Sequence, residues 1–380
     1  MARAKAWPWL VATLLTSGCV GFDYRYTPEQ EQRLLAEILG SVPETEPVSP
    51  LYLSDEAKQE LDRHIHRRWG DARKLDELRS FLFDEDKLDL TYSADDTRTA
   101  MQLWRSHRGN CLSMTNLFVA AARYVGIDAN YETVEVRPTW DQQGSTMVRY
   151  EHIIAVGKLD SGREYVVDFL PEFVIGGRKA TRITDRQATA LYYNNLGAES
   201  VIDGDYKKAV DNLVDAIRIN GRLSDAWNNI GAALRRNGQD DLAEFAYQRA
   251  VHLDTDNYSA LSNLAQFYQS KGREPEARYF VTRVNGYRRR NPYYHYFIAH
   301  HFFEQGEYRK AIVLLDQAIQ LKRDEPEFYD ALAKSWDKLG NTTESHRYAK
   351  LADRYRAGIS KPPPREHNHR FWIQNIRINN

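Results

Sequence analysis

Residues 108–128 read RGNCLSMTNLFVAAARYVGID, and this stretch decides the fold of the first half of the chain. Its apolar side chains recur at the spacing of one helix face, at Met114, Leu117, Phe118, Ala121, Ala122 and Val125. Gly126 ends the predicted helix. Cys111 stands at the amino-terminal end of the helix, on the same stripe, so the stretch predicts a packed helix that begins at a cysteine.

Helical patterns precede this stretch and strand patterns follow it. The helical patterns cover residues 54–69, 75–82 and 96–104. The strand patterns cover residues 131–137, 147–156 and 164–169. Asp160-Ser161-Gly162 is a hairpin turn signal between the last two. Helices followed by antiparallel strands predict an α+β domain over residues 51–185.

The chain after residue 190 repeats itself every 34 residues. A glycine recurs with this period at Gly204, Gly238, Gly272, Gly306 and Gly340. A small residue recurs at Ala209, Ala243, Ala277, Ala311 and Ser345. The glycine supplies a turn between two helices, and the small residues let those helices cross closely. The pattern resembles the tetratricopeptide repeat and predicts five units over residues 190–357, stacked into an all-α solenoid.

A solenoid of this kind has a concave face, which commonly binds a peptide or a protein. Trp227, Asn228, Asn263 and His295 lie near the first helices of their units and are the candidates for such contacts. Packing between helices is the alternative role for each of them. The expected partner is a protein or peptide, because a net charge of −1 gives no global electrostatic reason to expect nucleic acid.

The amino terminus has the pattern of a targeting segment over residues 1–18. Arg3 and Lys5 are followed by an apolar stretch and then by Leu15-Thr16-Ser17-Gly18-Cys19. This resembles a bacterial lipobox, which implies lipidation of Cys19, although Thr16 stands where leucine is usual. An ordinary secretory signal is the alternative. We therefore expect an outer-membrane lipoprotein that faces the periplasm, with residues 19–50 as a tether that contains one short helix.

Three residues are candidates for nucleophilic chemistry, which needs a thiolate, a histidine base and a group that orients the histidine. Cys111 begins a helix, where the helix dipole favours a thiolate and where its backbone N–H is a natural oxyanion donor. A hairpin centred near Ser161 places Leu159 opposite Arg163, so His152 and Asp168 become diagonal neighbours on one face. A shift of one residue in register would separate them.

This order of residues resembles the transglutaminase-like superfamily over roughly residues 95–180. The matching positions are Gly109, Cys111, Arg123, Gly126, His152 and Asp168. The resemblance implies a papain-like core and a Cys–His–Asp triad at Cys111, His152 and Asp168, and a peptidase or amide hydrolase activity that needs no cofactor. Two features depart from the common pattern: no tryptophan follows His152, and Phe169 follows Asp168 directly.

Several roles stay open. Asn110 is a candidate for a second oxyanion donor beside Cys111. The tail, residues 358–380, is expected to form a surface strand or arm, and its His367-Asn368-His369 cluster is too short to predict a metal site. The chain is either a thiol-dependent acyl-transfer enzyme that recruits protein through its repeats, or an inactive transglutaminase-like fold that acts with the repeats as a scaffold.

Overall fold

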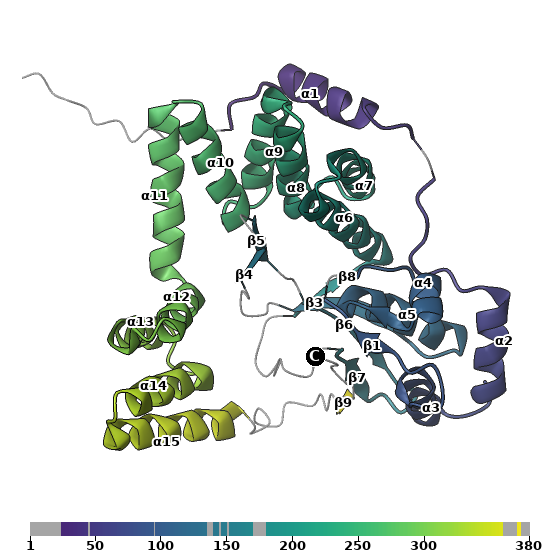
Figure 1. Ribbon diagram of the computed structural model, residues 1–380. Helices are drawn as coiled ribbons and strands as arrows, with labels where there is room; N and C mark the ends of the chain where they lie inside the picture. The colour runs from purple at the N-terminus through teal and green to yellow at the C-terminus, as the bar shows by residue number, and fades with distance from the viewer. Residues whose placement is uncertain are drawn as a thin grey trace, which may run out of the picture.

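The computed structural model describes residues 24–44, 46–94, 96–134, 140–143, 146–149, 152–169, 180–359 and 371–373. An α+β domain comes first, and a long array of paired helices follows it (Figure 1). The predicted fold class is confirmed by this order of elements.

The helices described here for the α+β domain are α2 (Asp55–His64), α3 (Asp71–Phe83), α4 (Ala100–Ser106) and α5 (Cys111–Tyr124). Three of these four, α2, α4 and α5, begin at a residue whose side chain caps the helix. Ser54 caps α2, and Thr99 forms a capping box with Gln102 at the start of α4. Almost every residue of α5 is buried, so α5 is the central helix of the domain.

A five-stranded sheet in the order β8-β3-β6-β7-β9 packs against α5 through β6. Its strands are β3 (Asn130–Val134), β6 (His152–Lys158), β7 (Glu164–Val167), β8 (Ala180–Ile183) and β9 (Phe371–Ile373). All neighbours are antiparallel except β7 and β9. The tail of the chain therefore returns to the edge of the first domain's sheet, as a short strand.

Two small sheets lie outside the main one. One pairs β1 (Thr91–Tyr92) with β2 (Arg108–Gly109), and the other pairs β4 (Trp140–Gln143) with β5 (Thr146–Arg149). The single strand predicted over residues 147–156 is therefore wrong, because β5 and β6 belong to different sheets. The register predicted for the hairpin is confirmed, since Ala155 pairs with Val167 and Lys158 with Glu164.

Five helical hairpins follow, in the register of the 34-residue repeat. They are α6 (Asp185–Asp203) with α7 (Tyr206–Ile219), α8 (Ser224–Arg236) with α9 (Asp240–Leu253), α10 (Tyr258–Ser270) with α11 (Glu274–Arg290), α12 (Pro292–Glu304) with α13 (Tyr308–Leu321), and α14 (Pro326–Lys338) with α15 (Thr342–Ile359). The recurring glycine of each hairpin has a φ between 66° and 81°, a conformation that favours glycine.

The buried apolar core is divided within the array. One continuous core extends from the α+β domain through the first three hairpins, as far as Val284 on α11. Residues of α12, α13 and α14 form a separate core around Ala299, Leu315 and Leu332. Among the described residues, the array is thus divided between two cores, and this division does not coincide with the boundary between the α+β domain and the array.

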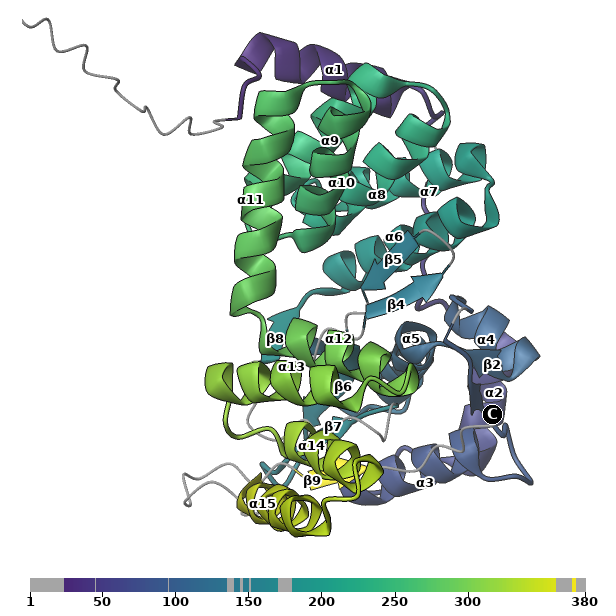
Figure 2. The same ribbon diagram turned by 60° about the vertical axis from the view of Figure 1, so that its left-hand side comes forward.

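Residues 24–43, called here the N-terminal arm, pack on the array, whereas the sequence predicted a tether with one short helix over residues 19–50. Their helix α1 (Pro28–Gly40) lies across the hairpins and away from the sheet in both views (Figures 1 and 2). Arg25 pairs with Glu244, and Glu31 pairs with Arg249. The Arg218 guanidinium donates to the carbonyls of Leu39 and Val42, at 2.7 Å each.

Candidate active site

Cys111 is the first residue of α5, as the sequence predicted. The helix cannot supply an acceptor for the backbone N–H of a residue at this position. The thiol is free and partly exposed. A partly exposed thiol beside unused backbone donors is the arrangement that acyl-transfer chemistry requires of a nucleophile and its oxyanion hole.

Gly109 explains why a glycine stands two residues before the cysteine. A Cβ atom here would lie 2.9 Å from Cβ of Ser113 and 3.0 Å from Cδ1 of Leu103. Any side chain would therefore push the entry to α5 away from α4 and displace Cys111.

His152 and Asp168 form a buried pair on neighbouring segments of the sheet. The Nε2 atom of His152 lies 2.7 Å from Oδ1 of Asp168, and each residue is only 2 % exposed. His152 begins β6, and Asp168 follows the last residue of β7. The observed register gives the diagonal relation that the hairpin predicted.

The pKa of His152 is raised from its ordinary value to about 9. Burial by itself disfavours the charged ring and lowers the pKa. The hydrogen bonds to Asp168 and to the thiol of Cys111, with the charges of these two groups, outweigh burial. Because Nε2 of His152 faces Asp168, Nδ1 is the ring nitrogen available to the thiol of Cys111.

Two residues to which the sequence assigned no role hold α5 against the sheet. The Thr115 hydroxyl donates to the Cys111 carbonyl at 2.7 Å and lies 3.5 Å from the carbonyl of Ile153, next to His152. Phe169 is buried, and its ring meets Phe118 of α5 at a centroid distance of 6.0 Å. Phe169, which departs from the common pattern after Asp168, thus holds the Asp168 segment against α5. The apolar run of β7 was its only sequence signal.

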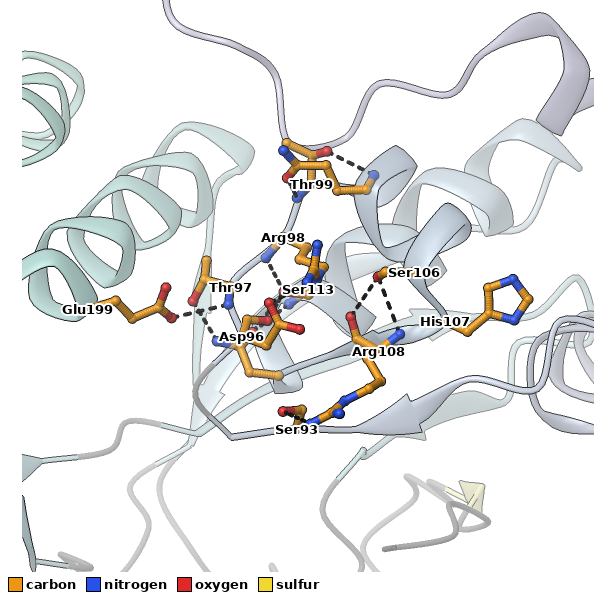
Figure 3. A network of polar contacts seen from close by, with 12 residues as sticks. Ser93, Asp96, Thr97, Arg98, Thr99, Ser106, His107, Arg108, Ser113 and Glu199 are labelled. Carbon is orange, nitrogen blue, oxygen red and sulfur yellow. Dashed lines mark hydrogen bonds and ion pairs between the residues drawn. The ribbon is translucent and has the colours of Figure 1, made fainter. Parts of the chain in front are cut away.

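Asn110 has a different role from the predicted oxyanion donor. Its Oδ1 accepts from the Ser113 backbone N–H at 3.0 Å, which caps α5, and its Nδ2 donates to Oγ1 of Thr97 at 2.6 Å. Both ends of the side-chain amide are therefore bound to neighbouring residues (Figure 3 shows the surrounding polar contacts). The backbone N–H of Cys111 remains the oxyanion candidate.

The four candidates on the array differ from one another. Trp227 is buried, and its Nε1 donates to the carbonyl of Gly221, so it packs between helices. Asn228 and Asn263 belong to a chain of amide hydrogen bonds that begins at Asn194 and passes through Asn229, with distances of 2.9 to 3.1 Å. His295 is partly exposed, and its Nε2 lies 3.3 Å from the carbonyl of Arg289.

Some predictions concern residues that the structure does not describe. Residues 1–18 and Cys19 lie outside the described residues. Within the described ranges, no helix combines the length and the apolar character needed to cross a bilayer. In the same part of the chain, no three His, Cys, Asp or Glu side chains are grouped so that they could hold a metal ion.

Comparison with family models identifies both parts of the molecule. Residues 60–168 match the model described as Transglutaminase-like superfamily. Residues 236–323 match the model described as Anaphase-promoting complex, cyclosome, subunit 3.

Individual relatives match only parts of the chain. Photosystem I assembly protein Ycf3 of Prochlorococcus marinus (strain MIT 9303) is 29% identical over 98 residues, which are 25% of this chain and 57% of that protein. Anaphase-promoting complex subunit 3 of Schizosaccharomyces pombe is 24% identical over 147 residues, 39% of this chain and 22% of that protein. The chain thus spans only about half the length, or less, of these curated relatives.

Solved structures give weaker matches. A MamA structure (AMB-1) is 21% identical, covers 44% of this chain and 92% of its own, and has a TM-score of 0.25. PilF of Pseudomonas aeruginosa is 18% identical, covers 45% and 78%, and has a TM-score of 0.27. Scores this low support no argument about function. The family models, together with the observed elements, show that this chain joins a transglutaminase-like domain at residues 60–168 to a region of tetratricopeptide-type repeats.

Proposed function

We propose that this protein is a thiol-dependent acyl-transfer enzyme of the bacterial envelope, which acts on an amide or acyl group of a protein that its repeats recruit. The observation that carries the proposal is the buried hydrogen bond of 2.7 Å between His152 and Asp168, beside Cys111 at the start of α5. Burying an ion pair is costly, so stability alone does not account for this arrangement. Roles as nucleophile, base and orienting group do account for it.

The chemistry follows from the roles of the three side chains. The Cys111 thiolate attacks the carbonyl carbon, and the backbone N–H of Cys111 donates to the oxyanion. The His152 imidazolium gives its proton to the leaving amine as the carbon–nitrogen bond breaks, which leaves a thioester. Water or a second amine then attacks the thioester, His152 takes its proton, and the Cys111 thiolate is released, which restores the thiolate–imidazolium pair. Asp168 holds the ring throughout.

The array supplies the site for the protein partner in this proposal. The Asn194–Asn229–Asn228–Asn263 chain crosses α6, α8 and α10, so it connects the first helices of three successive hairpins. Asn229 and Asn263 of this chain are partly exposed, and their amide side chains offer both donors and acceptors to an extended backbone.

The location in the envelope rests on the lipobox-like sequence before Cys19. Mass spectrometry of the amino-terminal peptide from membranes tests it. A peptide that begins at Cys19 and carries acyl chains supports the anchor. An unmodified peptide that begins elsewhere contradicts it and leaves the proposed chemistry untouched.

The test of the chemistry is the rate at which iodoacetamide alkylates Cys111 as a function of pH, in a chain that lacks its first 19 residues. Cys111 is then the only cysteine. We expect fast alkylation at neutral pH, where a free thiol with a pKa of about 8.5 reacts slowly. Replacing His152 with glutamine should return the profile to that of a free thiol.

Turnover has its own control. Cys111→Ala should abolish cleavage or transfer of model amides and leave the thermal unfolding midpoint close to the wild-type value. An inert thiol in the wild-type chain, or turnover that survives Cys111→Ala, would favour the scaffold function over the enzyme.

A further inference from the structure

Hydrogen bonds connect the first helix of the array, α6, to both ends of α5, the helix that carries the nucleophile, directly at one end and indirectly at the other. At the carboxyl-terminal end of α5, Arg123 pairs with Asp185 of α6, with Nη1 at 2.5 Å and Nη2 at 2.9 Å from the two carboxylate oxygens. At the other end, the contact is indirect and passes through residues 96–98, which precede α4. Helix α6 therefore spans the length of α5.

The indirect contact begins at Glu199, near the end of α6. Its Oε1 accepts the backbone N–H of Thr97 at 3.1 Å, across the boundary between the array and the domain (Figure 3). The Thr97 hydroxyl in turn accepts from Nδ2 of Asn110, the capping residue of α5. Glu199 thus lies two hydrogen bonds away from the residue that immediately precedes Cys111.

Residues 96–98 are bonded to the first turn of α5 at several further points. The backbone N–H of Asn110 donates to the Asp96 carbonyl at 3.0 Å. The backbone N–H of Arg98 donates to Oγ of Ser113 at 2.7 Å, and Ser113 is fully buried. A displacement of this segment would therefore displace the cap and the first turn together.

The position of that first turn decides the distance between the thiol and the imidazole. A catalytic arrangement has to be held within roughly 0.5 Å of its productive geometry. His152 is fixed from the sheet by Asp168, whereas Cys111 is fixed by the amino-terminal end of α5. The two sides of the pair are thus supported by different parts of the molecule.

We propose that Glu199 is a positioning residue for Cys111: through Thr97 and Asn110, the first repeat helix holds the thiol in place beside His152. The proposal rests on the nucleophilic role assigned to Cys111. It makes the array part of the catalytic support as well as the site for a partner.

The test compares three variants in the full chain, with Cys19→Ser in all of them so that Cys111 is the only thiol. Glu199→Ala removes the acceptor for Thr97. Glu199→Gln keeps a side-chain carbonyl oxygen at the same position and removes only the charge. Asp185→Ala is the matched control, because it deletes the other α6 carboxylate that contacts the domain, at the end of α5 far from Cys111.

Two quantities are measured: the pH profile of Cys111 alkylation by iodoacetamide, and the titration midpoint of His152 by NMR. In Glu199→Ala we expect alkylation at pH 7 to slow by roughly tenfold or more, because small misplacements of reacting groups cost large factors in rate. The His152 midpoint should fall, since contact with the thiol contributes to its elevated value. Glu199→Gln and Asp185→Ala should match the wild-type chain in both measurements.

Three results would overturn the proposal: unchanged profiles in Glu199→Ala, failure of glutamine to restore them, or an equal effect of Asp185→Ala, which would indicate general loosening. An inert wild-type thiol would contradict the proposed function instead. The His152 midpoint still decides the positioning role in that case, because it reports the thiol–imidazole contact without any reaction.

Discussion

Asp168 determines the state of His152 at the scale of single residues. The carboxylate lies just beyond β7, and its Oδ1 is 2.7 Å from the ring nitrogen that points away from the thiol. Because both groups are buried, little solvent is available to replace this contact. The protonated ring is consequently favoured to a higher pH than that of an ordinary histidine.

A pH dependence of stability follows from this raised pKa. A histidine whose pKa is about 9 in the folded chain, against about 6.5 when unfolded, stabilises the fold fully below pH 6.5. The contribution is lost as pH rises from 6.5 through 9. Asp168→Asn should lower the His152 midpoint, followed by NMR, and flatten the fall in the free energy of unfolding over this interval. A midpoint that stays near 9 in this variant would contradict the role given to Asp168.

Gly157 is a second residue with a measurable consequence. A Cβ atom at this position would lie 1.9 Å from the carbonyl oxygen of Asp128 and 2.6 Å from the Tyr165 ring. Gly157→Ala should therefore cost about 3 kcal/mol in denaturant unfolding, because backbone atoms cannot move aside cheaply. Gly40→Ala is the control, since open space surrounds that position and the change should stay within about 1 kcal/mol. Equal losses of unfolding free energy in the two variants would show that the sheet shifts to make room for the added methyl group.

The pairing of α5 with the sheet sets the geometry of the site at the scale of elements. Phe169 contacts Phe118 on α5 and Phe83 on α3, so one ring joins the end of β7 to two helices. Phe328 is equally buried, in the last hairpin, where it contacts Tyr293 and Tyr296.

Substituting these two phenylalanines distinguishes a loss of stability from a displacement of the candidate active site. Phe169→Ala and Phe328→Ala should each cost about 3–5 kcal/mol on unfolding, because each leaves a cavity in a packed core. Only Phe169→Ala should also slow Cys111 alkylation and move the His152 titration, both measured well below the unfolding temperature. If Phe328→Ala moved them equally, the site would depend on overall stability and not on the aromatic contact.

The elements also show how much the sequence could predict. The register between His152 and Asp168 was predictable because a short hairpin turn fixes it, and Ala155 does pair with Val167. The hairpins of the array were predictable because each glycine repeats the same turn. The N-cap role of Asn110 was not predicted, because its bond to Thr97 depends on a segment before α4 that no motif marks.

Contacts distant along the chain left no local signal. Glu199 lies 102 residues beyond Thr97, and neither belongs to a recognisable motif. Arg25 and Glu31 resemble the charged residues at the start of any exposed helix, so the sequence does not indicate their partners. Their ion pairs with Glu244 and Arg249 are visible only in the folded array. Such tertiary ion pairs follow from how hairpins stack, which periodicity alone does not specify.

At the scale of the whole molecule, the two cores that divide the described array should differ in stability. The first core joins the transglutaminase-like domain to the first three hairpins, and α12 to α14 form the other. Hydrogen exchange of the intact chain should give α5, α6 and α8 a common, high opening free energy, and α12 and α13 a lower one. A single value throughout would contradict the division. If the opening free energy instead changed between β8 and α6, the boundary would lie between the α+β domain and the array.

The N-terminal arm has a consequence for the order in which the chain is made. Arg25 leaves the ribosome early, but its partner Glu244 follows 219 residues later, and Arg249 stands at a similar distance from Glu31. Arg25 and Glu31 therefore lack these ion-pair partners until the second hairpin of the array is synthesised. Contacts this distant in sequence close late and slowly. This early segment is accordingly among the last to fold, and its docking shows that the second hairpin is already in place.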